Sequence, residues 1–254
     1  MRVRHLPVAA VILLGARILS AQSASEHIAL GDRAHEEMKA IEALGHYEQA
    51  LKADATRYEA LWKASRESVD LAEFDADHDD ASKRFKDGEL YARRAIAARP
   101  DDAEGHFYRA RALGKVALTL GTKERIRYAK DVRNEALAAL KINPNHPGAL
   151  HVMGRWNAEV MRLNGMSRFI AKTFLGGAIF NSASWEDAVR YMERSVAADP
   201  NRLTHHLDLG EIYADLGQPA KAREQFEIVL KGQATDFNDA HYKRDAAERL
   251  KGLS

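Results

Sequence analysis

The sequence predicts an all-α protein made of repeated helical hairpins. Of its 254 residues, only 6 are proline and 16 are glycine, while 46% are hydrophobic and 30% are charged. This composition is typical of a helix-rich globular chain and excludes a disordered or collagen-like one. From Glu26 onward the apolar residues follow the period of amphipathic helices, and no window alternates with the period of a strand. Composition and periodicity therefore both predict an all-α fold. Internal self-similarity of the sequence is the third observation that supports it.

The self-similarity lies in a pattern of small and apolar residues that marks the second helix of each hairpin. Copies of the pattern are Tyr47-x-x-Ala50, Ala92-x-x-Ala95-x-x-x-x-Pro100, Ala136-x-x-Ala139-x-x-x-x-Pro144, Met192-x-x-Ser195-x-x-x-x-Pro200 and Phe226-x-x-Val229. Small residues let the paired helices approach closely, and the proline begins the next hairpin. The pattern predicts a tetratricopeptide-like superhelix over residues 26–254, with repeats longer than the usual ~34 residues. We expect the last amphipathic segment, Asn238 to Leu250, to be the capping helix of the array.

The first 21 residues differ from the rest and have the layout of a secretory signal peptide. A basic start with Arg2 and Arg4 precedes an apolar stretch from Leu6 to Ala16 and then small polar residues up to Ala21. The apolar stretch is shorter than the roughly 20 residues that span a bilayer. We therefore expect residues 1–21 to be cleaved and the protein to be exported, periplasmic or secreted. The alternative is an uncleaved membrane anchor.

Charge and cysteine content exclude several classes of function. Lysine and arginine total 38 against 37 acidic residues, so no basic excess favours nucleic acid as a partner. The absence of cysteine excludes disulfides, cysteine-bound zinc and thiol catalysis. Asp75-x-Asp77-x-Asp79 lacks the later glycine and glutamate of a calcium loop. The sequence thus predicts no catalytic residues, no metal site and no cofactor.

Several short stretches, in order along the chain, are similar to one known family. They are Leu61-Trp62-Lys63-Ala64, Glu104-Gly105-His106-Phe107-Tyr108, Asn143-Pro144-Asn145-His146-Pro147, Gly154-Arg155-Trp156, and Phe169-Ile170-Ala171 before Phe174-Leu175-Gly176. From about residue 60 to the C-terminus the chain resembles the regulator of microtubule dynamics family. The resemblance implies a tetratricopeptide-like fold that binds partners and, in a mitochondrial member, phospholipid. An exported chain would meet no tubulin, so we do not expect a microtubule role.

Three arginines recur at one position of successive first helices, directly after a small residue: Ser65-Arg66, Ala110-Arg111 and Gly154-Arg155. In such arrays this position faces the concave groove. Trp62, Phe107 and His151 stand four residues earlier, one turn away on the same face. Since a guanidinium binds phosphate or carboxylate bidentately, the pattern predicts a cradle for an anion with an apolar body. The alternative is that each arginine pairs with an acid of a neighbouring helix and stiffens the stack.

The segment from Met166 to Asn181 is apolar and belongs to no repeat. We expect it to fold over the groove near Trp156 as a lid or ligand wall, with Phe169 and Phe174 pointing inward; core packing and contact with a membrane surface are the alternatives. The sequence therefore predicts a non-enzymatic scaffold whose groove binds a protein or peptide partner. The alternative function is binding of a phospholipid or another anionic amphiphile in the same groove.

Overall fold

The computed structural model describes residues 23–163 and 177–253. The predicted signal peptide and the predicted inward-pointing residues Phe169 and Phe174 lie outside the described residues. Within the described ranges the regular structure is helical, and no helix is long and apolar enough to cross a membrane. Residues 23–36 form the first helix. The following elements are α2 (Ala40–Ala53), α3 (Tyr58–Glu73), α4 (His78–Ala98), α5 (Ala103–Leu118), α6 (Thr122–Ile142), α7 (Pro147–Arg162), the 3₁₀ helix η1 (Gly177–Ser182), α9 (Trp185–Ala198), α10 (Leu203–Asp215), α11 (Pro219–Lys231) and α12 (Asp239–Gly252).

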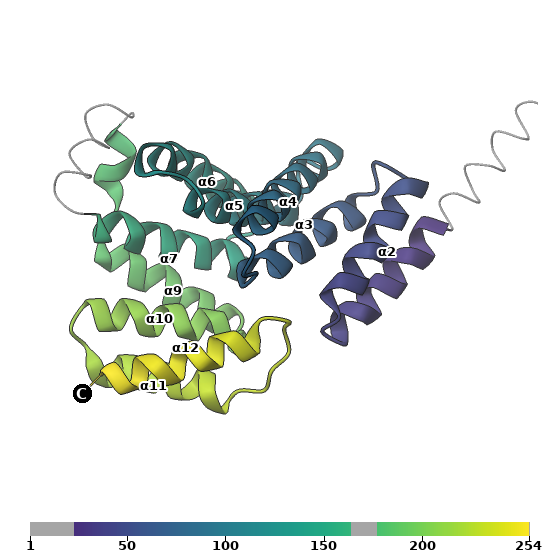
Figure 1. The fold of residues 1–254 in the computed structure, drawn as a ribbon. Helices are drawn as coiled ribbons and strands as arrows, with labels where there is room; N and C mark the ends of the chain where they lie inside the picture. Colours follow the sequence, from purple (N-terminus) through teal and green to yellow (C-terminus); the bar gives the residue numbers. More distant parts are fainter. Residues whose placement is uncertain (1–22, 164–176, 254) are drawn as a thin grey trace, which may run out of the picture.

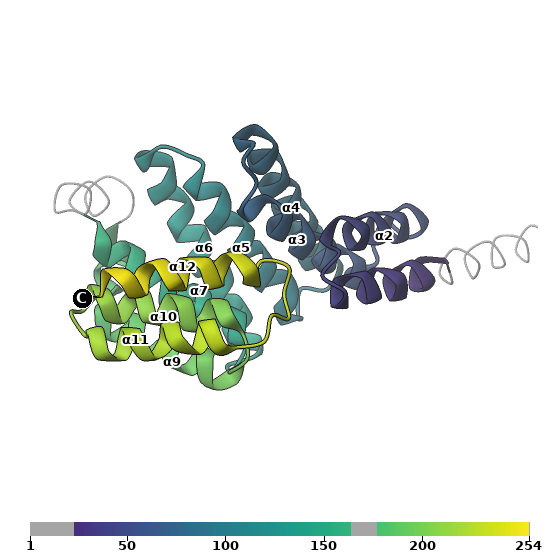
Figure 2. The same ribbon diagram turned by 60° about the horizontal axis from the view of Figure 1, so that its bottom comes forward.

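The helices form hairpins that stack side by side into a curved array (Figure 1). The first helix pairs with α2, and the later pairs are α3 with α4, α5 with α6, α7 with α9, and α10 with α11. Successive hairpins pack through α2 on α3, α4 on α5, and α6 on α7. Figure 2 shows α12 lying along α10 and α11, where the sequence predicted a capping helix. The predicted tetratricopeptide-like superhelix with a C-terminal cap is confirmed.

Close approach within a hairpin explains the small residues of the repeat. At Gly31, a side chain would bring its Cβ to 2.5 Å from the Tyr47 ring, and at Gly210 to 2.5 Å from the Phe226 ring. Tyr47 and Phe226 are 0% and 1% exposed, so neither ring has room to move aside. The same steric rule therefore shapes the first and the last hairpin.

Side-chain caps fix the starts of several helices. Asp77, Asp102 and Ser184 each accept a hydrogen bond from a backbone N–H in the first turn of α4, α5 and α9. The aspartates that resemble a calcium loop are thus the entry of α4. Proline stands in the first turn of α7 and of α11, where its missing N–H has no helical partner to lose.

The long repeats have two causes. Both α4 and α6 contain 21 residues, against 14 in α2 and in α9, which lengthens the second and third hairpins. In the fourth hairpin the added length lies between α7 and α9. There Phe180 of η1 is 3% exposed and stacks on Trp156, with ring centroids 6.0 Å apart. The described end of the apolar insertion therefore packs beside Trp156.

Candidate functional site

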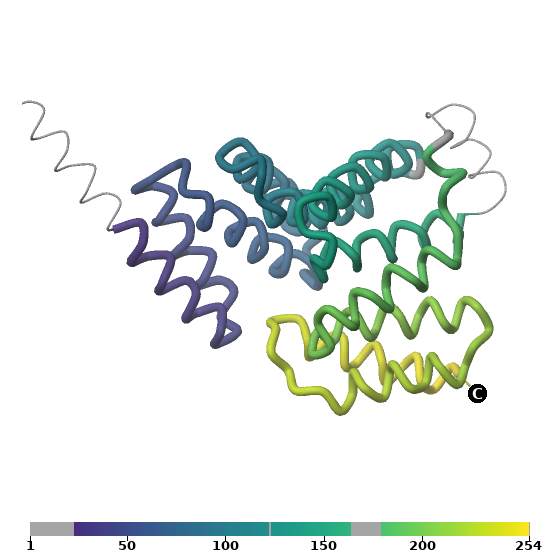
Figure 3. The backbone as a smooth tube through the Cα atoms, turned by 180° about the vertical axis from the view of Figure 1, so that it is seen from behind, coloured from purple at the N-terminus to yellow at the C-terminus, as the bar shows by residue number. Residues whose placement is uncertain are grey.

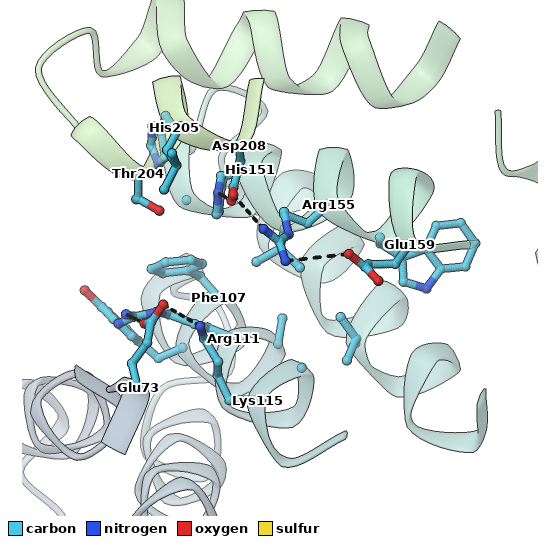
Figure 4. A pocket seen from close by; sticks show the side chains of 18 of the residues that line it. Glu73, Phe107, Arg111, Lys115, His151, Arg155, Glu159, Thr204, His205 and Asp208 are labelled. Atoms are coloured by element: carbon cyan, nitrogen blue, oxygen red, sulfur yellow. Dashed lines mark hydrogen bonds and ion pairs between the residues drawn. The ribbon is translucent and has the colours of Figure 1, made fainter. Parts of the chain in front are cut away.

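The concave side of the superhelix holds a cavity of about 610 Å³. The first helices of four hairpins, α3, α5, α7 and α10, line it together with parts of α6 and α12. Figure 4 shows the side chains of α5 and α3 facing those of α7 and α10 across this space. The volume lies within the ~300–1,000 Å³ typical of ligand pockets.

The floor of the cavity is apolar. It is formed by Phe107 of α5, Val132 of α6, and Val152 and Trp156 of α7. Phe107 lies directly against Gly148, where an added Cβ would overlap its ring, so α5 and α7 approach closely. The indole Nε1 of Trp156 donates a hydrogen bond of 2.8 Å to the carbonyl of Ala129. We call Phe107, Val132, Val152 and Trp156 the apolar floor.

One side of the floor is bounded by ion pairs between α3 and α5, which we call the α3–α5 wall. Arg111 donates to Asp70 at 2.5 Å and to Glu73 at 3.4 Å. The Lys115 ammonium lies 2.6 Å from the other oxygen of Glu73. Burial alone would raise the pKa of Glu73, but Lys115 and Arg111 hold it below its usual range. Asp70 is 2% exposed, so its pair with Arg111 is nearly dry.

The opposite side is bounded by ion pairs between α7 and α10, which we call the α7–α10 wall. Arg155 donates to Asp208 at 2.5 Å, and His151 Nε2 lies 2.6 Å from the other oxygen of Asp208. Burial alone would raise the pKa of Asp208, but Arg155 and His151 hold it well below its usual range. His205 stacks on His151 with ring centroids 4.8 Å apart. Burial, together with His151 and Arg202, lowers the pKa of His205, so its imidazole is neutral at pH 7.

The α7–α10 wall extends into a larger charged network. Glu211 contacts three guanidinium groups, those of Arg249 at 2.5 Å and of Arg155 and Arg162 at 3.7 Å each. Arg162 also pairs with Glu159 and Asp215. Burial and the neighbouring Asp208 carboxylate raise the pKa of Glu211 to about 7. Burial and Asp208 thus outweigh the three guanidinium groups, and Glu211 is partly protonated near neutral pH.

Five of the predicted binding residues line the cavity: Phe107, Arg111, His151, Arg155 and Trp156. Both arginines are paired with buried carboxylates of neighbouring first helices. This pairing is the alternative that the sequence offered to a cradle for an anion. Their role in ligand binding stays a prediction.

Two further predicted residues, Trp62 and Arg66, are not among the residues that line the cavity. Arg66 lies over the Trp62 ring at 5.5 Å, as the four-residue spacing predicted. Its Nε donates to Glu67 at 2.7 Å, and Trp62 stacks on Tyr108 at 5.3 Å. The first arginine therefore lies outside the cavity that the other two line.

Sequence reasoning missed the acids that hold these arginines. A partial signal was present: Asp70, Lys115 and Glu159 each stand four residues after an arginine of the series and thus one turn further on the same face. The charge at this position changes sign from each first helix to the next, and this alternation indicates ion pairs between neighbouring helices. Asp208, which binds Arg155 most directly, carries no comparable spacing signal because it lies 53 residues away.

The fold and the cavity define a helical-repeat protein of the tetratricopeptide class. The family model for regulator of microtubule dynamics protein 1-3 matches residues 27–254, and the chain belongs to this family. It is 27% identical over 198 residues to regulator of microtubule dynamics protein 1 of Bos taurus, covering 77% of this chain and 62% of that protein. With regulator of microtubule dynamics protein 3 of Rattus norvegicus it shares 20% identity over 197 residues, 77% of this chain and 41% of that protein. The chain thus spans about three fifths or less of the length of these relatives.

Solved structures support the same fold. The tetratricopeptide-repeat protein TTC0263 of Thermus thermophilus matches with a TM-score of 0.64 at 17% identity, covering 91% of this chain and 98% of that one. The Pseudomonas aeruginosa protein pilF matches with a TM-score of 0.50 at 14% identity, covering 92% and 93% of the two chains. At these identities the likeness concerns the fold alone.

Proposed function

We propose that this protein is a non-enzymatic scaffold whose concave cavity binds a segment of a protein partner. The observation that supports the proposal most directly is the apolar floor between two ion-paired walls. Since the arginines of the walls are already neutralised by carboxylates, the free energy of binding comes chiefly from burial of the partner's own apolar side chains against Phe107 and Leu118, the more exposed apolar residues of the lining. Phe107 packs against Gly148 and holds α5 close to α7, so the floor is formed before the partner arrives.

A search with random displayed peptides against the purified protein tests this function. We expect selected peptides to carry a large apolar residue and to lose about ten-fold in affinity when Leu118, which lines the cavity, is replaced by serine. Leu118 is 51% exposed, so Leu118→Ser leaves the fold intact. Ile41→Ser is the matched control, because Ile41 is 74% exposed and lies on α2 away from the cavity. Equal affinities for both variants would contradict the proposal.

The alternative ligand is a phospholipid or another anionic amphiphile. It is favoured by the position of Arg155, which is 35% exposed in its side chain and lies beside the apolar floor. Native mass spectrometry of the purified protein distinguishes the two ligands. Retained lipid that Leu118→Ser releases, combined with an unsuccessful peptide search, would favour the amphiphile.

The site of action follows from the N-terminal segment. The names of the relatives concern microtubules, but we propose that residues 1–21 export this chain and that its partner lies outside the cytoplasm. Sequencing the N-terminus of the protein from its native host tests this. A mature start near Gln22 is expected, and an intact Met1 in a cytosolic fraction would contradict it.

A further inference from the structure

The C-terminal part of the chain reaches back across the concave side to the second hairpin. The Asn238 side-chain amide donates a hydrogen bond of 2.9 Å to the backbone carbonyl of Asp70, which lies 168 residues earlier. By comparison, the bond between Arg155 and Asp208 joins positions only 53 residues apart. In Figure 3 the loop before α12, drawn in yellow, lies beside the end of α3. The superhelix is therefore closed on itself at this point.

Aromatic contacts extend the closure into α12. Phe74 at the end of α3 stacks on His241 with centroids 4.2 Å apart and meets Tyr242 edge-on at 5.6 Å. Tyr242 also lies near Glu73, a residue of the α3–α5 wall, and contributes to lowering the pKa of that carboxyl. At its other end α12 supplies Arg249, which binds Glu211 of the α7–α10 network. Thus α12 connects the two walls of the cavity, and its Tyr242 and Asp245 form part of the lining.

The junction with α3 is polar and only weakly stabilised. Asp70, Asn238 and Asp239 are each at most 2% exposed, and each keeps one buried side-chain oxygen without a hydrogen-bond partner in the described part of the chain. Dry unpaired acceptors are costly, and water would satisfy them on opening. The apolar contribution is small, because Phe74 remains 36% exposed in the closed form. By contrast, Tyr242 and Ala246 belong to the apolar core shared with α10 and α11, so α12 stays with the last hairpin when the junction opens.

We infer that residues 238–242 form a clasp that binds the end of α3 as an intramolecular ligand and closes the cavity in the free protein. Opening the clasp separates the second hairpin from α12 and widens the cavity without unfolding either part. A partner that enters between the two walls competes with the Phe74 and Asp70 contacts of the clasp. The clasp is a property of the unliganded chain and does not depend on what the cavity binds.

The chain contains no cysteine, so two introduced cysteines would be its only thiols and can be labelled selectively. Spin labels at Lys86→Cys on α4 and Glu248→Cys on α12 occupy exposed positions and report the separation across the clasp. We expect the distance distribution to contain a main short population and a minor long one. In Phe74→Ala/Asn238→Ala the long population should grow about ten-fold relative to the short one, since one hydrogen bond and one ring stack are lost. The helical circular dichroism signal should not change.

The matched control is Asn157→Ala. Asn157 is also a buried asparagine, 2% exposed, whose amide donates to a backbone carbonyl at 2.8 Å, but its acceptor Met153 lies within the same helix. This variant should leave the distance distribution unchanged. If the double variant fails to fold, Phe74→Ala alone serves, because its ring is partly exposed. A distribution that is identical in wild type and in the clasp variant would overturn the inference, as would opening of equal size in Asn157→Ala.

Discussion

Arg111 and Arg155 occupy the same position of successive repeats, yet they pair in opposite directions. Arg111 on α5 reaches back to Asp70 and Glu73 of the preceding first helix, whereas Arg155 on α7 reaches forward to Asp208 of the following one. The junction between α5 and α7 therefore receives neither guanidinium and is filled by Phe107 against Gly148. One repeated residue thus creates two charged walls, and the apolar floor lies where the pairing direction reverses.

The two walls also differ in dryness. The side chain of Arg111 is 15% exposed and that of its partner Asp70 is 2% exposed, against 35% and 7% for Arg155 and Asp208. Removing one partner of a desolvated ion pair lowers the unfolding free energy more than removing one partner of a solvated pair does.

The largest effect is expected from Asp208→Ala, which leaves Arg155 and His151 without the buried carboxylate that they share. Breaking a buried pair in this way costs about 3 kcal/mol of unfolding free energy. Urea denaturation followed by circular dichroism measures it. Asp215→Ala is the control, since Asp215 pairs with Arg162 at a 36% exposed position, and we expect a loss below about 1 kcal/mol there. Equal losses in the two variants would show that the α7–α10 wall is not desolvated.

The variants Arg111→Met and Arg155→Met compare the contributions of the two arginines to stability directly. Arg111→Met removes the guanidinium that hydrogen-bonds Asp70 in the dry wall and leaves Arg202 as the nearby cation, whereas the acids around Arg155 keep His151, Arg162 and Arg249 as neighbours. We therefore expect Arg111→Met to lower the unfolding free energy by about 1–2 kcal/mol more than Arg155→Met does. The reverse order in chemical denaturation would contradict the assignment of the drier wall.

The smallest effect concerns acid stability. The folded-state pKa values of Asp208 and Glu73 lie below their usual range, so both carboxylates stabilise the fold above pH ~4, and this stabilisation is lost as the pH falls through the folded-state values. Asp208→Asn should remove part of the loss of stability between about pH 4 and pH 2, and Glu73→Gln a further part. Melting temperatures measured across this range check both, and an unchanged slope in Asp208→Asn would contradict the low pKa.

Local steric rules made most of the fold predictable. The repeat pattern located the second helices because its members Tyr47 and Phe226 pack directly against a glycine of the paired first helix. It also placed Arg66 over Trp62 correctly, since a spacing of four residues fixes that contact within one helix.

Contacts that depend on curvature were not predictable in this way. The superhelix decides whether Arg155 meets Asp208, and whether Asn238 meets Asp70. Of the expected lid, the described end packs in the core, where Phe180 stacks on Trp156 and does not line the cavity, while Phe169 and Phe174 lie outside the described residues. A repeat pattern therefore predicts the faces of helices but not which charged groups meet across them.

The most direct test of the central claim is the salt dependence of peptide affinity. If the arginines serve the walls and the partner binds chiefly to the apolar floor, the Kd of a selected peptide should change less than about two-fold between roughly 50 and 500 mM NaCl, because screening acts on exposed charge pairs. A weakening of about ten-fold over the same range would show that the ligand's charge binds the guanidinium groups. That result would contradict the account of two saturated walls around an apolar floor.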